Sequence, residues 1–248
     1  MVNEAANESD DTGMRIFLRW ILGLILIAAS GTIILVWSGT VVLPPRYDPW
    51  SPLDIRAVPN LLTRFKLARL DGDAGQCHAV LGSTRLRFTP VPDRVSGNGC
   101  GLTDTVQVSR SEVAFNAGFT VTCPLAAAWM LFETHALQPA AERHFGRRVE
   151  RVQHLGSYAC RNVYGRPEGR RSEHATANAL DIAGFVLDDG TSITLSRDWS
   201  RDGGGRAAFL RDVHDGACRF FNVVLGPDYN EAHRDHFHVD MGGFRTCR

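Results

Sequence analysis

The segment "HRDHFHVD", residues 233–240, places three histidines and two aspartates in eight consecutive positions. The β-branched and aromatic residues of "HFHVDMGGF" predict a short strand that Gly242 and Gly243 end. Side chains alternate along a strand, so one face carries His236, His238 and Asp240 and the other carries Asp235, Phe237 and Val239. Such an ionisable face either points to water or lines a cleft with a metal or catalytic site.

A second group lies in "RRSEHATANALDIAGF", where His174 and Asp181 are seven residues apart. If "NALDIAGF" is a strand, the small side chains of Ala179 and Ala183 leave room around Asp181, and His174 lies in the loop before it. A hydrolytic zinc site takes three nitrogen or oxygen ligands and keeps one position open. Together with His238 from the first segment, His174 and Asp181 supply such a set. A histidine and an aspartate at this spacing also occur by chance, so the two segments carry weight only together.

The elements that position these residues are predicted from periodicity and turn residues. Helices are expected over "NLLTRFKLARL", over "PLAAAWMLFETHALQPAAERHF" with an interruption at Pro139, and over "GRAAFLRDVHDGACRFFNVVLG" up to Gly226-Pro227. Short strands and turns are expected over residues 77–122 and over "RRVERVQHLGSYAC", and a hairpin over "NALDIAGFVLDDGTSITLSRDW" with its turn at Asp189-Gly190. This mixture predicts an α+β fold, an antiparallel sheet with flanking helices, rather than a doubly wound sheet.

An uncharged apolar stretch runs from Trp20 to Leu43. As a helix it would be ~36 Å long, enough to cross a hydrocarbon core of ~30 Å. We therefore expect a cytoplasmic tail over residues 1–19, one transmembrane helix over 20–43, a proline-rich spacer over 44–60 and a globular domain over 61–248. A cleaved signal peptide is the alternative, with weak cleavage sites in "ASG" and "WSGT".

All six cysteines follow this stretch: Cys77, Cys100, Cys123, Cys160, Cys218 and Cys247. An even number on one side predicts three disulfides in an oxidising compartment, so the domain is expected to face the periplasm or cell exterior from the inner (cytoplasmic) membrane. Buried free thiols are the alternative. We expect Cys218 to pair with Cys247. The formal net charge of +0 gives no reason to expect nucleic acid as a partner, and the oligomeric state stays open.

The chain resembles the bacterial extensin-like C-terminal domain family from about residue 61 to its end. The resemblance is carried by "CPLAAAW", "QPAAERHFG", "GSYACR", "SEHATANALDIAGF" and "LGPDYNEAHRDHFHVD". The pair "SEHATANALD" and "HRDHFH" also resembles the motifs of the LAS metallopeptidases, which include D-Ala-D-Ala peptidases, murein endopeptidases and the hedgehog signalling domain. This resemblance implies a LAS or hedgehog-like fold.

The resemblance also implies a role for each site residue. It makes His174, Asp181 and His238 the ligands of one zinc ion, His236 the acid/base, and His233 a supporting residue. It also matches Ser172 and places Arg161 toward substrate, where a guanidinium could pair a carboxylate or a developing oxyanion; an exposed structural arginine is the alternative. The pattern has glycine where this chain has Ala177, so a turn with positive φ there would be strained.

The expected function is that of a membrane-anchored zinc metallopeptidase that acts on peptide amide bonds of peptidoglycan. Zinc would lower the pKa of a water molecule, neutral His236 would take the proton, and Arg161 or protonated His233 would stabilise the oxyanion. Two alternatives stay open: a zinc-containing module that binds the cell wall without chemistry, and a disulfide-stabilised structural protein whose histidines are incidental. Which bond is cut does not follow from the sequence.

Overall fold

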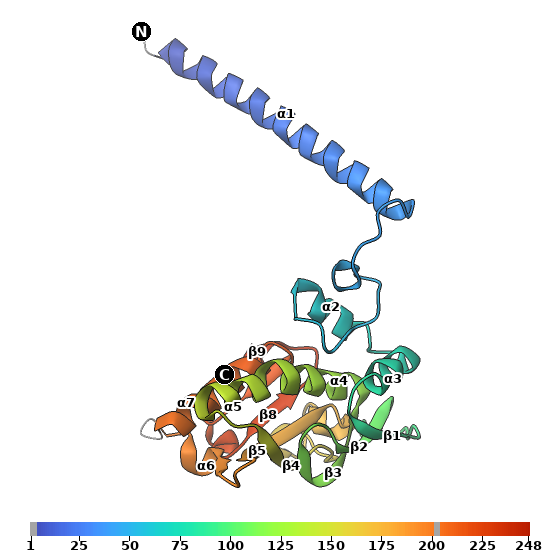
Figure 1. The fold of residues 1–248 in the computed structure, drawn as a ribbon, viewed down its shortest axis with the longest axis vertical. Coiled ribbons are helices and arrows are strands. Elements are labelled where there is room, and N and C mark those ends of the chain that lie inside the picture. The colour runs from blue at the N-terminus through green and yellow to red at the C-terminus, as the bar shows by residue number, and fades with distance from the viewer. Residues whose placement is uncertain (1–3, 201–203) are drawn as a thin grey trace. The chain divides into compact units, whose positions relative to one another are not determined.

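The computed structural model of the protein describes residues 4–200 and 204–248 (Figure 1). The chain divides after Asp48 into two units, which are described separately. In the first unit, helix α1 covers Glu4–Trp37, and its part Gly13–Trp37 is long and apolar enough to cross a membrane. The predicted span of 20–43 overlaps this part over residues 20–37, and the helix ends at Trp37. The helix ends before Gly39, whose φ of 72° is the left-handed conformation common after a helix C-terminus.

The second unit, Pro49–Arg248, begins earlier than the domain boundary predicted at residue 61. Leu53 and Ile55, inside the predicted spacer, are buried in the hydrophobic core. Only the first part of the proline-rich segment thus lies outside the compact unit, where Pro45–Tyr47 form the short helix η1.

One sheet holds nine strands within the described residues, in the order β1-β2-β3-β4-β5-β8-β7-β9, with β6 paired to β5. The strands are β1 Arg87–Val91, β2 Thr105–Arg110, β3 Ala114–Thr122, β4 Val149–Gly156, β5 Ala179–Leu187, β6 Ser192–Thr194, β7 Val223–Leu225, β8 Phe237–Asp240 and β9 Thr246–Cys247. The sheet is mixed, not wholly antiparallel as expected, because β3–β4 and β7–β9 pair in parallel. A helical crossover between β3 and β4 makes their parallel pairing possible.

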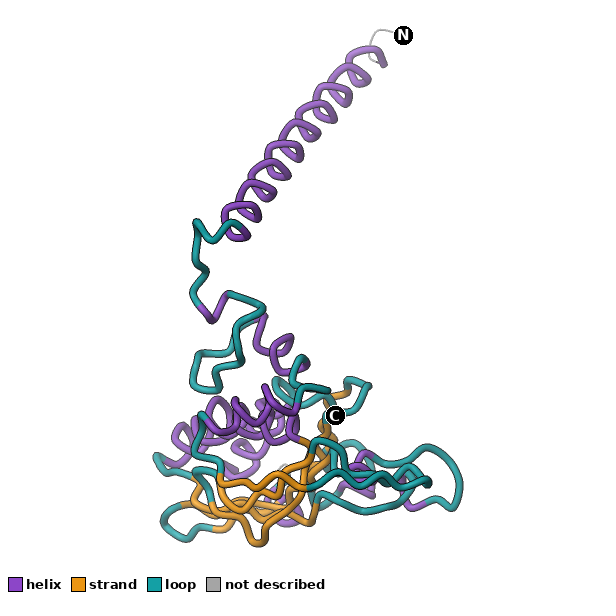
Figure 2. Tube along the Cα trace, turned by 90° about the vertical axis from the view of Figure 1, so that its right-hand side faces the viewer, coloured by secondary structure: helices purple, strands orange, loops and turns teal. Residues whose placement is uncertain are grey.

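The helices of this unit are α2 Leu61–Ala68, α3 Ala74–Gly82, α4 Cys123–Phe132, α5 Gln138–Phe145, α6 Leu195–Asp198 and α7 Gly204–Ala217. Short 3-10 helices cover Val163–Gly165 (η3), Glu173–Thr176 (η4) and Glu231–His233 (η5). Most of the helices in this unit lie on one side of the strands (Figure 2). Every residue of α4 is buried, and α7 buries Phe209, Leu210 and Val213. The core therefore lies between these helices and the sheet.

Three local predictions need correction. Residues 77–82 are helical rather than extended, because Asp73 caps the start of α3 by accepting a hydrogen bond from the backbone nitrogen of Gln76. Pro139 does not interrupt its helix; a π-helical turn, Glu133–Leu137, joins α4 to α5 just before it. The last helix ends at Ala217 and not at Gly226, since the β-branched residues of Val223–Leu225 form β7, which pairs with β8 and with the edge strand β9.

The six cysteines form three disulfides, Cys77–Cys123, Cys100–Cys160 and Cys218–Cys247. The predicted presence of three disulfides and the predicted pairing of Cys218 with Cys247 are thus confirmed. Each bond joins segments at least 29 residues apart in the chain, so each restricts the unfolded chain over a long loop.

We predict that Phe237→Ala destabilises the protein by about 3–5 kcal/mol, the usual cost of emptying a core phenylalanine site. Phe237 is 1% exposed, with Trp199 and His214 at ring distances of 5.4 and 5.5 Å. Chemical denaturation of the purified variant measures the loss. Phe244→Ala is the matched control, because that ring is 65% exposed and should cost less than about 1 kcal/mol. Equal effects in the two variants would show that Phe237 is not a core residue.

Candidate metal centre

Two of the predicted ligands are brought together by strand register. β5 and β8 pair antiparallel, and Asp181 is the direct cross-strand partner of His238. Directly paired residues project to the same face of a sheet. The Nδ1 atom of His238 consequently lies 3.0 Å from Oδ1 of Asp181. Phe237 and Val239 are buried on the opposite face, which confirms the predicted alternation within β8 itself.

The third predicted ligand, His174, comes from the short helix η4 that precedes β5. The hydroxyl of Ser172 accepts a 3.4 Å hydrogen bond from the backbone nitrogen of His174 and so caps this helix. Ala177 ends it with a φ of 56°, a left-handed conformation that glycine adopts more easily. The strained turn expected at this position is therefore present. It directs the chain from η4 into β5 and leaves His174 3% exposed.

These three residues converge on one point. The Nε2 atom of His174 lies 3.2 Å from Asp181 Oδ1 and 3.1 Å from His238 Nδ1. Two ligands bonded to zinc at about 2.0 Å with a tetrahedral angle would be about 3.3 Å apart. The observed separations of 3.0–3.2 Å are close to that value, so the donor set fits a zinc ion with little adjustment.

The outer nitrogens of both imidazoles determine which atoms face this point. His174 Nδ1 donates to the backbone carbonyl of Ser157 at 3.0 Å, because a carbonyl only accepts. His238 Nε2 donates to Asp240 Oδ2 at 3.0 Å. When both rings are neutral, the nitrogens that face the point of convergence, Nε2 of His174 and Nδ1 of His238, must carry lone pairs. Metal-ligating histidines are commonly oriented by a carbonyl or a carboxylate on the second nitrogen, as here.

Charge within the group follows from the same contacts. Burial would raise the pKa of Asp181, but hydrogen bonds from His174 and His238 hold it far below its usual range. Burial lowers the pKa of His238, yet its hydrogen bonds to Asp181 and Asp240 outweigh burial and raise it to about 9. Without a metal ion, a proton on His238 therefore occupies the space between the three acceptor atoms at neutral pH.

His236 lies beside this group and outside it. Its Nε2 atom is 3.7 Å from Asp181 Oδ1, while its Nδ1 atom donates to Asp235 at 2.9 Å. An aspartate on one nitrogen fixes the tautomer and leaves the other nitrogen as an acceptor facing the three candidate ligands. The sequence prediction missed Asp235 as a site residue, because strict alternation placed it on the opposite face. Both residues precede the first residue of β8, so the alternation does not hold there.

His233 packs against the same group, with ring distances of 5.3 Å to His236 and 5.8 Å to His238. Its Nδ1 atom contacts Asn230 Oδ1 at 2.7 Å. Burial and the neighbouring histidines lower the pKa of His233 to about 4, so its ring is neutral at pH 7. The expectation that protonated His233 stabilises an oxyanion is therefore not supported, since the ring carries no charge at that pH.

The group forms part of the wall of a cavity of about 470 Å³. Arg161, Arg170, Ser172 and Glu173 also line it, as do the aromatic rings of Tyr164, Tyr229 and Phe244. Arg161 is exposed, and the disulfide of the preceding Cys160 ties its loop to Cys100. The cavity therefore brings the predicted ligands, His233, His236, Arg161 and Ser172 to one place.

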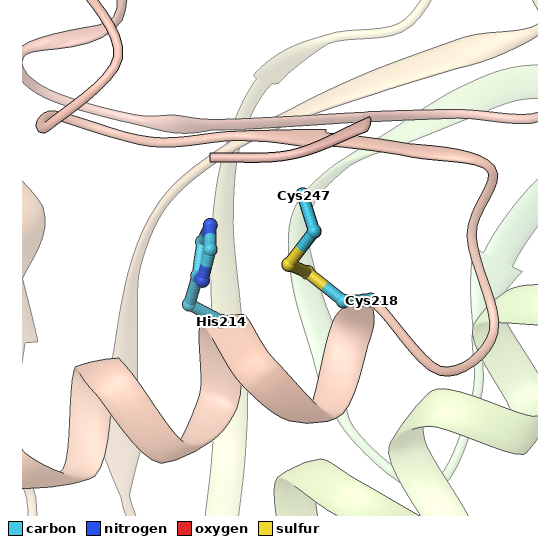
Figure 3. A group of neighbouring side chains, drawn as sticks. All are labelled: His214, Cys218 and Cys247. Carbon is cyan, nitrogen blue, oxygen red and sulfur yellow. A yellow bond between two sulfur atoms is a disulfide. The ribbon is translucent and has the colours of Figure 1, made fainter. Parts of the chain in front are cut away.

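A second cluster has metal-binding residue types but different chemistry. His214, Cys218 and Cys247 lie close together, with the two sulfur atoms joined in a disulfide (Figure 3). Disulfide sulfurs are not thiolates, and thiolates are what bind zinc. The Nε2 atom of His214 instead contacts the backbone carbonyl of Arg248 at 3.2 Å. This cluster holds the C-terminal segment to α7.

We predict that His238→Ala abolishes zinc binding and that His236→Ala retains it. The first variant removes one of three converging donors, whereas the second removes none of them. Zinc titration of both purified variants, each first stripped with chelator, measures the difference. Circular dichroism should show that both are folded. Equal loss of zinc in the two variants would mean that His236 is itself a ligand.

We also predict that zinc affinity depends steeply on pH. The pKa of His238 is raised from 6.5 to about 9, so its protonation stabilises the metal-free protein below pH 6.5 and that contribution disappears through pH 9. Zinc must displace the proton, so apparent affinity should rise roughly tenfold per pH unit and level off above about 9. Titration of the stripped protein at several pH values tests this. A flat profile between pH 7 and 9 would contradict the proton's place at His238.

The sequence comparisons bear on the family. The family model described as "Extensin-like protein C-terminus" matches residues 75–248, a range that contains every residue of this centre. The comparisons with curated proteins and with solved structures found no match. The expected family is thus confirmed, while the expected relationship to LAS metallopeptidases stays a hypothesis. The chain belongs to the extensin-like protein C-terminus family.

Proposed function

We propose that this protein is a zinc-dependent hydrolase that cuts amide bonds in the peptides of peptidoglycan. The single observation that carries the proposal is the convergence of His174, Asp181 and His238 beside a fourth residue, His236, that is oriented but not part of the triangle. Structural zinc sites are usually closed by four protein ligands, whereas catalytic sites use three. The relationship to the LAS metallopeptidases that the sequence motifs imply is part of this proposal.

The residues around the centre have distinct roles in the proposed reaction. Zinc held by His174, Asp181 and His238 would polarise the scissile carbonyl and make water acidic enough to attack near neutral pH. His236 would accept the proton from that water at Nε2 and return it to the departing amine. Asp235 would hold the Nδ1 proton and stabilise the positive ring that forms. His233 would act as a neutral group, because its pKa of about 4 excludes a charge at pH 7.

The lining of the cavity supports a peptide that carries charges of both signs. Arg161 can pair with a carboxylate, as expected from the sequence, and Arg170 adds a second guanidinium. Glu173 offers a carboxylate to an amino group, although it also lies 3.7 Å from Arg170. Peptidoglycan stem peptides have free carboxylates and amino groups, which this lining could bind.

The proposed location is a cytoplasmic membrane, with the domain on its outer side. The apolar helix Gly13–Trp37 supports an anchor, and the three disulfides support an oxidising compartment. A cleaved signal sequence is the alternative for the same helix.

We predict that the zinc-loaded protein releases peptides from purified murein and that chelator stops the release. His236→Ala should slow the reaction by roughly 10²–10⁴-fold while zinc stays bound, the usual effect of losing a positioned acid or base. Mass analysis of the soluble products measures the rate and identifies the bond. The matched control is His144→Ala, because this histidine pairs with Asp212 at 2.8 Å and does not line the cavity.

Binding to murein without release of products would contradict the proposal. The protein would then be the non-catalytic wall-binding module. An equal rate in the wild type and in His236→Ala would contradict the role assigned to His236 and leave the metal centre untouched.

A further inference from the structure

A second depression in the domain is lined mainly by arginines. It has a volume of about 710 Å³ and lies where β1 and β2 meet the segment before β4. Four arginines, one glutamate and three other residues line it: Arg85, Arg87, Arg110, Arg148, Glu112, Ser111, Gln138 and Val149. The formal charge of the whole chain is +0, so the overall composition does not reveal the local excess of positive charge in this depression.

Only one of the four guanidinium groups is neutralised. Arg148 pairs with Glu112 at 2.9 Å. Within residues 4–200 and 204–248, the side chains of Arg85, Arg87 and Arg110 have no hydrogen-bond or ion-pair partner, and all three residues are exposed. Many other arginines of the domain, such as Arg143, Arg197 and Arg206, pair with aspartates. The depression therefore holds three uncompensated positive charges.

Strand register forces two of these charges together. Arg87 and Arg110 are cross-strand partners between β1 and β2, where the register shifts before Phe88, and both line the depression. Like charges directly opposite each other destabilise a strand pair. Such a pair is tolerated more easily when an anion binds between the two groups.

Glu133, a carboxylic acid near this depression, does not supply an anion for these arginines. Glu133 is buried beside Ser111, and its oxygens accept hydrogen bonds from the backbone of Val113 and from the indole of Trp129 at 3.1 and 2.8 Å. Burial raises the pKa of Glu133. The amide of Gln138 is likewise occupied by both backbone groups of Val149. The polar groups of Glu133 and Gln138 are thus already satisfied within the protein and do not compensate the three exposed arginines.

We propose that Arg85, Arg87 and Arg110 form a binding site for a phosphate group. A guanidinium binds phosphate through two parallel N–H bonds, and a tetrahedral phosphate has enough oxygens for several guanidinium groups, whereas one carboxylate has two. The same chemistry could come from a soluble phosphate compound or from a phospholipid headgroup. The site shares no residue with the metal centre and does not depend on the proposed hydrolase function.

The test uses the full chain in neutral detergent, stripped of metal, with inorganic pyrophosphate as the probe. Calorimetric titration at low salt should show binding that weakens as salt increases. The triple variant Arg85→Gln, Arg87→Gln, Arg110→Gln should lose at least about tenfold in affinity. The control variant Arg143→Gln, Arg197→Gln, Arg206→Gln removes three paired arginines and should bind as the wild type does.

Two further arms decide the ligand class and its source. Citrate, a carboxylate probe of similar charge, should bind much more weakly than pyrophosphate; equal binding would overturn the assignment to phosphate. Micelles with added phosphatidylglycerol should reduce pyrophosphate binding if headgroups occupy the site, and unchanged binding would indicate a soluble ligand. The single variant Arg85→Gln, outside the strands, provides a check should the triple variant misfold. Unaltered pyrophosphate affinity in both arginine variants would overturn the proposal.

Discussion

Two imidazole nitrogens and one carboxylate oxygen lie 3.0–3.2 Å from one another, and each can only accept a proton or donate a lone pair at that point. Three such atoms repel unless they share a cation. The outer nitrogens of His174 and His238 are already committed to Ser157 and Asp240, so the rings cannot turn their N–H groups inward without breaking those bonds. Either a proton or a metal ion must therefore lie between them, and this requirement underlies the proposed chemistry.

The fold maintains this arrangement from several directions. Pairing of β5 with β8 sets Asp181 opposite His238, while Phe237 and Val239 anchor the same strand in the core. The left-handed turn at Ala177 brings His174 back over the sheet. The Cys100–Cys160 bond ties down the loop that carries Arg161. The candidate ligands thus rest on a strand pair and a capped helical turn, elements that hold side chains more rigidly than a free loop would.

Sequence patterns predicted the parts of this centre that depend on local rules. The alternation of "HFHVD" placed His238 and Phe237 on opposite faces, because a strand with one buried face leaves little freedom of register. Patterns could not reveal Ser157 and Asn230, which approach only through tertiary structure. Asp235 was assigned to the wrong face because the strand begins only at Phe237. The sequence also did not predict the parallel pairs β3–β4 and β7–β9, because the connections between strands, and not strand composition, set the direction of pairing.

The distinction between a hydrolase and a wall-binding module depends on how many protein groups hold the metal. X-ray absorption at the zinc edge of the zinc-loaded protein counts imidazole ligands directly. The account predicts two imidazoles, from His174 and His238, together with one carboxylate and one light-atom ligand that an added small anion can replace. A third imidazole, supplied by His236 or His233, with no exchangeable position would contradict the account and indicate a closed structural site.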